Sequence, residues 1–303
     1  MFKQYLLGRY ALKLIMKTIT VLLILLTQAC SSLSSSNNKN MAMEQLIIAE
    51  PLTVNYKSEL AIARLTDIIQ RAELTNEQRA ELYYDRGVRY DSVGLSALAR
   101  LDFNRALRLK PDLYDAYNFL GIQFTQMQEF IQAYDAFDSA LDLNPEHQYA
   151  YFNRGIALYY GGRPQLAITD LSRFQQQKNS DPYRVLWLYL AEVEIDPIVA
   201  TKHLRDNGKN IKDDIWAKGL IKLYLNEISL NEFTRTLPYG LASQQALTER
   251  LCEAYFYLGK FSLLYGEKSI AANYFKLALG TNVYEFVEHR YARLELDMLR
   301  EIN

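Results

Sequence analysis

Small and large apolar residues recur along this chain with a fixed period. Glycine, alanine and a bulky apolar residue each return every 34 residues, always in the same order. The recurring positions are Gly87, Gly121 and Gly155, then Ala99, Ala133 and Ala167, then Phe103, Phe137 and Leu171. Such a period is typical of stacked helical repeats, in which one pair of helices buries its apolar face against the next pair. The pattern predicts an array of helices, and no strand pattern competes with it.

Thirty-four residues is the length of one tetratricopeptide unit, which consists of two antiparallel helices and their turns. Glycine and alanine lie where the helices cross, aromatic residues fill the surrounding space, and proline ends the second helix. Residues 80–113 and 114–147 meet all of these requirements, whereas Phe174 occupies a small-residue position in the third unit and Asp196-Pro197 interrupts the fourth. We predict an all-α tetratricopeptide (TPR) solenoid over residues 45–303, with repeats at 80–113, 114–147, 148–181, 184–208 (degenerate) and 252–285.

Both ends of such an array need a cover, because a terminal repeat would expose an apolar side to water. Helical spacing of apolar residues over 56–71 and 286–301 predicts an N-terminal and a C-terminal capping helix. Thr75 and Gln78 have the form of a capping box. Between Asn207 and Thr248 helices are still expected, but the repeat register is lost there.

The first forty residues differ from the rest. Lys13 and Lys17 precede the apolar run 19–26, and Cys30 opens a serine- and asparagine-rich stretch. The run is shorter than the roughly 20 residues of a permanent membrane span, so we expect a cleaved secretion signal over 1–29 and a polar tether over 30–44. Met16 is an alternative start. The pattern resembles a bacterial lipoprotein signal, which implies that Cys30 is lipidated; the alternative is a spare cysteine after an ordinary signal.

Net charge and cysteine content limit the classes of function that fit the sequence. Residues 1–29 hold four basic residues and no acidic one, so the mature chain has 34 − 4 = 30 basic against 35 acidic residues, a balance of −5. A nucleic-acid surface has the opposite sign, and we expect no nucleic-acid partner. With Cys30 acylated, Cys252 has no disulfide partner. At the first position of its repeat helix it is expected to be a small buried hydrophobe, with a reactive thiol as the alternative.

Known catalytic motifs are missing from the sequence. It contains no glycine-rich phosphate loop, no Gly-x-Ser-x-Gly, no His-Glu-x-x-His and no Cys-x-x-Cys. His147, His203 and His289 stand apart without ligand spacing. We therefore predict no catalytic residue, no metal ligand and no cofactor, and interpret the histidines as structural or exposed.

A concave surface lined by the first helix of each unit is the expected binding site. Its inward positions in similar proteins correspond here to Tyr84, Val88, Asn118, Ile122, Tyr149, Phe152, Ile156, Tyr159 and Tyr160. Tyrosine combines apolar area with a polar tip, which suits protein recognition. The alternative is that these aromatic residues pack against the irregular region after Asp181. The basic clamp with which some tetratricopeptide domains hold a terminal carboxylate is missing.

Four strings carry a more specific resemblance: Arg86–Val88, Asn153–Arg163, Leu186–Glu192 and Phe286–Ala292. On these the chain resembles the NlpI family, tetratricopeptide lipoproteins of the outer membrane in gamma-proteobacteria. The resemblance implies a homodimeric periplasmic adaptor, lipid-anchored at Cys30 on the periplasmic face of the outer membrane. It implies binding to a tail-specific protease, to a peptidoglycan endopeptidase and to other murein hydrolases, with a link to cell division.

Two classes of function fit the sequence. A non-enzymatic adaptor agrees with the periodicity, the aromatic groove and the missing motifs. A cell-wall enzyme with a noncontiguous acidic site is the alternative, because such sites assemble only in space. Incubation with peptidoglycan and with candidate partners separates the two.

Overall fold

The computed structural model describes residues 46–301. A division of the chain falls between Ile47 and Ile48, and the description below concerns the part that begins at Ile48. The predicted signal segment 1–29, the tether 30–44 and Cys30 lie outside the described residues. Within 46–301 all regular structure is helical and no strand is present, which confirms the all-α prediction.

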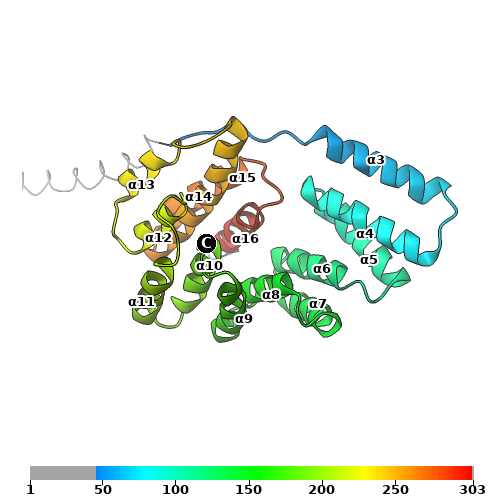
Figure 1. Cartoon of the computed structure of the whole chain (residues 1–303), viewed down its shortest axis with the longest axis horizontal. Helices are drawn as coiled ribbons and strands as arrows, with labels where there is room; N and C mark the ends of the chain where they lie inside the picture. The colour runs from blue at the N-terminus through cyan, green and yellow to red at the C-terminus, as the bar shows by residue number, and fades with distance from the viewer. Residues whose placement is uncertain (1–45, 302–303) are drawn as a thin grey trace, which may run out of the picture. The chain divides into compact units, whose positions relative to one another are not determined.

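Helical hairpins follow one another along the chain (Figure 1). After α3 (Tyr56–Arg71), they are α4 (Asn76–Ser92) with α5 (Ser96–Leu109), α6 (Tyr114–Gln126) with α7 (Phe130–Leu143), α8 (Gln148–Tyr160) with α9 (Pro164–Gln177), and α10 (Pro182–Glu192) with α11 (Pro197–Gly208). The chain continues with α12 (Lys218–Tyr224), α13 (Leu230–Thr236), α14 (Gln244–Leu264), α15 (Lys268–Leu279) and α16 (Val287–Glu301).

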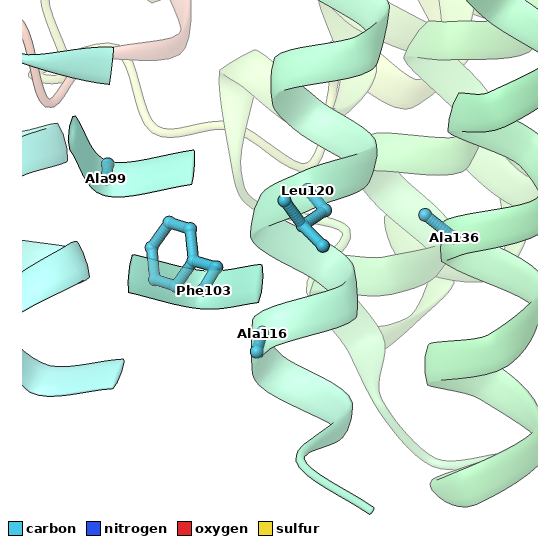
Figure 2. Packing of buried hydrophobic residues seen from close by; sticks show 5 residues of the cluster. All are labelled: Ala99, Phe103, Ala116, Leu120 and Ala136. Carbon is cyan, nitrogen blue, oxygen red and sulfur yellow. The ribbon is translucent and has the colours of Figure 1, made fainter. Parts of the chain in front are cut away.

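Glycine lets the helices of a hairpin approach closely. A Cβ atom added to Gly121 would lie 2.6 Å from the Phe137 ring, and the distances are 2.7 Å for Gly87 to Phe103 and 2.5 Å for Gly259 to Phe275. Contacts this short leave no space for a side chain, so the recurring glycine is a requirement of packing. Figure 2 shows one of these apolar layers, where Phe103 lies beside α6. Its buried members are Ala99, Phe103, Ala116, Leu120 and Ala136.

Local signals set the starts of α4 and α11. The Thr75 hydroxyl accepts a hydrogen bond from the Gln78 amide while the Gln78 side chain accepts one from the Thr75 amide, which confirms the capping box. At the predicted interruption, Asp196 caps α11 by accepting hydrogen bonds from the Ile198 and Val199 amides, and Pro197 occupies the first turn.

The region after α11 holds a short hairpin that the period did not reveal. A Cβ atom on Gly219 of α12 would lie 3.2 Å from Phe233 of α13, so a glycine and a phenylalanine again meet at the crossing. The hairpin lacks the 34-residue length, which is why it escaped the repeat pattern. A second difference concerns α14, which begins at Gln244 behind the cap Ser243, so the prediction that Cys252 opens a helix is wrong.

The last helix packs inside the array instead of covering only its end. Helix α16 contacts α14 and α15, and it reaches α6 (Figure 1). Tyr291 and Leu294 of α16 are almost completely buried by these contacts. No helix among residues 46–301 combines the length and the apolar character needed to cross a membrane.

Candidate partner-binding surface

The predicted groove positions fall into two environments. Five of them are buried, with exposed fractions of 8% or less: Asn118, Ile122, Phe152, Ile156 and Tyr160. The expectation that they line an open surface is wrong. Tyr84, Val88 and Tyr159 are half-buried, and Tyr149 is 59% exposed. Whether a partner binds near the exposed positions stays a prediction.

Helices α10 and α16 cover the buried aromatic residues. The Tyr160 ring stacks on Tyr291 of α16 with centroids 5.3 Å apart, and its edge meets Trp187 of α10 at 6.4 Å. Phe152 stacks on Phe174 at 4.5 Å and also meets Trp187. Phe152 and Tyr160 therefore pack against the region after Asp181, which was the alternative that the sequence left open. Their apolar surface is buried inside the protein and is not available to a partner.

A buried ion pair fixes α16 in this position. Lys260 of α14 donates to the Glu295 carboxylate at 2.5 Å and to the Tyr159 hydroxyl at 2.7 Å, and the Tyr160 hydroxyl donates to Glu295 at 2.8 Å. Burial by itself would lower the pKa of Lys260, but the Glu295 carboxylate outweighs it and holds that pKa above its ordinary value. The lysine is therefore charged, and Tyr159 is one of its hydrogen-bond partners.

An open cleft lies between α3 and α4, and it contains Tyr84 and Val88. The opposite wall is α3, where Leu60 is 45% and Ile68 is 42% exposed. The Tyr84 ring packs against Phe119, so only part of it is available to a partner. The remaining lining is Lys57, Ala61, Arg64, Leu65, Asp85 and Arg89. We call this site the α3–α4 cleft: apolar in its walls and charged at its rim.

A second cavity, of about 270 Å³, lies among α8, α9, α10, α14 and the start of α16. We call it the aromatic–acidic pocket. Its aromatic lining is Tyr149, Phe152, Phe174, Tyr183, Trp187 and Phe286, its acidic lining is Asp181, Glu253, Glu285 and Glu288, and Arg184 and Val287 complete it.

Two carboxyl groups of this pocket are perturbed by their surroundings. Burial, reinforced by the neighbouring Glu288 carboxyl, raises the pKa of Glu253 to about 9. Burial raises the pKa of Glu288 to about 7, although the Tyr257 hydroxyl donates a hydrogen bond to it. The sequence reading missed both residues, because they lie on different helices and share no motif. Only folding brings them together.

The predicted structural residues have ordinary roles. His147 caps α8 and meets Asp115 at 3.0 Å, His203 meets Glu192 at 2.8 Å, and burial lowers the pKa of His289 to about 4. Cys252 is completely buried, and burial raises the pKa of its thiol, which disfavours the reactive thiolate. Among the described residues no group of histidine, cysteine and acidic side chains is placed to hold a metal ion.

Comparison with known proteins identifies the fold. No family model matches the chain. A tetratricopeptide repeat protein from Parabacteroides merdae is 16% identical, with 81% of this chain and 100% of that one covered and a TM-score of 0.51. PilF of Pseudomonas aeruginosa is 16% identical over 73% of this chain and 99% of its own, with a TM-score of 0.43. YrrB, described as a TPR protein with an unusual peptide-binding site, is 16% identical over 77% and 97%, with a TM-score of 0.40. The first of these likenesses shows that the chain has the tetratricopeptide-repeat fold.

Proposed function

We propose that this protein is a non-catalytic adaptor, anchored by a lipid on Cys30 to the periplasmic face of the outer membrane. It acts as a homodimer that binds a tail-specific protease and presents a peptidoglycan endopeptidase and other murein hydrolases to it. In this way it regulates cell-wall degradation and cell division. The resemblance to the NlpI family supplies these partners. The observation that carries the binding role is the α3–α4 cleft.

Exposed apolar side chains gathered in one cleft favour protein recognition over simple solvation. Leu60 and Ile68 lie about two turns apart on α3, opposite Tyr84 and Val88 of α4. Lys57, Arg64 and Arg89 place positive charge around them. An apolar centre with a charged rim is the usual anatomy of a protein interface. The cleft therefore suits an apolar segment of a partner that carries acidic residues at its edges.

One observation supports the enzymatic alternative. Glu253 and Glu288 share the aromatic–acidic pocket, and a carboxyl with a raised pKa can donate a proton near neutral pH. A cell-wall hydrolase with two such groups would release soluble fragments from peptidoglycan. The adaptor would release none by itself, so incubation of the purified protein with peptidoglycan decides between the two.

The binding role is tested with purified tail-specific protease. We expect the full chain to bind it, and Leu60→Ala to weaken binding about tenfold, or about 1.4 kcal/mol, through loss of apolar contact. Ile198→Ala is the matched control, because Ile198 is an 83% exposed aliphatic residue on α11, away from the cleft. Equal affinity of the wild type and both variants, with unchanged melting temperatures, would remove the α3–α4 cleft from the interface. Failure of the wild-type chain to bind would contradict the function itself.

A further inference from the structure

The aromatic–acidic pocket differs from the α3–α4 cleft in the sign of its charge. Four carboxyl groups line it, and Arg184 is the one basic side chain among its lining residues. Asp181 is occupied, because it caps α10 and lies 3.9 Å from Arg184. Among the described residues Glu253, Glu285 and Glu288 have no basic side chain within ion-pair distance. The pocket thus contains acidic groups without an ion-pair partner, and within the described part of the chain the only basic charge that acts on Glu253 is that of Arg250, which lies outside the lining.

Its walls also contain an unsatisfied hydrogen-bond donor. Trp187 is completely buried, and its Nε1 has no partner. A guanidinium carries donors only, so the indole N–H is not a contact for an arginine side chain. Because Trp187 lines the cavity, its N–H instead serves as a reporter of what enters the pocket.

Aromatic faces in the pocket can hold a cation. The Arg184 guanidinium lies 3.6 Å from the centroid of Phe174, so one lining ring already stacks with a planar cation. Tyr149 is largely exposed at the pocket and its ring lies 5.7 Å from Phe174. Guanidinium groups combine stacking on aromatic rings with paired hydrogen bonds to carboxylates, whereas an ammonium is a compact and strongly hydrated charge.

We propose that the aromatic–acidic pocket binds an arginine side chain of a partner protein, held by the rings of Tyr149 and Phe286 and by the carboxylates of Glu253 and Glu288. The inference rests on the proposed adaptor function, since it assigns a second recognition site for a partner. A cavity of about 270 Å³ accommodates one long side chain and excludes a folded element. The raised pKa of Glu253 agrees with a carboxyl that lacks its cation in the unbound protein.

Trp187 provides the readout, because the chain has two tryptophans and the other is Trp216. We would label the tryptophans of the full chain isotopically, assign their two indole N–H resonances with Trp216→Phe, and titrate with blocked Gly-Arg-Gly peptide. Saturable movement of the Trp187 resonance alone is expected. The same peptide with citrulline, which is neutral and nearly isosteric, should give no movement. A lysine peptide that binds as tightly as the arginine peptide would overturn the choice of guanidinium.

Substitutions in the pocket test whether the shift of the Trp187 resonance comes from binding of the arginine peptide at this site. Glu253→Gln keeps the size of the side chain and should weaken arginine binding at least tenfold, and Tyr149→Ala, at an exposed position, should also weaken it. Glu227→Gln, an exposed acidic residue outside the pocket, is the matched control. An unchanged titration of Glu253→Gln with an intact melting curve, or equal movement with citrulline, would overturn the proposal.

The outcome is separable from that of the adaptor function. Peptide binding needs no protease, so a pocket that binds arginine while the protease does not bind contradicts the adaptor role alone. Protease binding that survives both Glu253→Gln and Tyr149→Ala, together with no response to the peptide, contradicts the pocket alone.

Discussion

At the scale of the residue, glycines that face bulky rings set the closeness of the hairpins. Phe137 is completely buried, so its ring cannot move away to admit a side chain on Gly121. The same holds for Phe103 opposite Gly87. Alanine is a better helix former than glycine by about 1 kcal/mol, and this gain opposes the cost of the clash. A side chain larger than alanine makes the clash dominate.

We predict that Gly121→Leu lowers the free energy of unfolding by about 1–3 kcal/mol or more, because it overpacks the crossing with Phe137. Thermal melting followed by circular dichroism measures this. Gly280→Ala is the control, since a Cβ there meets only backbone oxygens at an ordinary 3.4 Å. A melting temperature of Gly121→Leu equal to that of the wild type would show that the helix crossing can accommodate a leucine side chain.

A second residue-scale prediction concerns pH. The pKa of Glu253 is about 9 in the folded protein, above that of an ordinary glutamate, so the folded state binds more protons than the unfolded state between the two values. Stability from this group is therefore greatest in acid and declines as pH rises towards 9. We expect Glu253→Gln to remove part of this decline and to exceed the wild type at pH 9 by about 2 kcal/mol, or roughly 4–8 °C. The measurement is the melting temperature of the wild type and of Glu253→Gln at pH 5 and at pH 9. An equal change in melting temperature for the two proteins between these pH values would contradict the raised pKa of Glu253.

At the scale of the element, the position of α16 depends on groups from three helices. Glu295 of α16 meets Lys260 of α14 and Tyr160 of α8, and all three side chains are buried. Removing one member leaves an uncompensated charge in the interior, whereas replacing both ions by apolar residues of similar size does not. The pair therefore makes the docking of α16 specific without contributing much net stability.

We expect Glu295→Leu to destabilise the protein by about 3–5 kcal/mol and the double change of Glu295→Leu with Lys260→Met to recover most of that loss. Urea unfolding of the four proteins in this double-mutant cycle gives the coupling energy. Losses that simply add would mean that the two charges do not interact. Arg300→Met, at an exposed ion pair on the same helix, should change stability by less than about 1 kcal/mol.

At the scale of the whole molecule, the proposed adaptor depends on an attachment that lies outside the described residues. A single acyl chain gives only marginal membrane binding, whereas several chains on Cys30 would make the attachment stable, at about 0.8 kcal/mol per buried methylene. We predict that Cys30→Ser leaves the protein unprocessed at that site and absent from the salt-washed outer-membrane fraction. Retention of the variant in that fraction would place the anchor elsewhere. Because Cys30 is not part of the helical array, we expect Cys30→Ser to leave the melting temperature of the array unchanged.

The sequence determined the repeat architecture because the spacing of small and large residues is a local record of how two helices cross. The recurring glycines Gly87, Gly121 and Gly155 indicate three hairpins. Thr75 with Gln78 indicates the start of a helix, and Asp196-Pro197 indicates a break between two helices, since these signals involve residues only a few positions apart. The hairpin of Gly219 and Phe233 uses the same chemistry without the period, and so it was not recognised.

Tertiary structure decided which apolar positions are open. Tyr149 and Tyr160 look alike in the sequence, yet one is exposed and the other lies under Tyr291, a residue far along the chain. Glu253 and Glu288 likewise meet only when α16 returns to α14. A helix pattern shows which face is apolar but not what covers that face, because the cover is chosen by contacts between distant segments. The repeat could therefore be predicted from the sequence, whereas the binding surface could not.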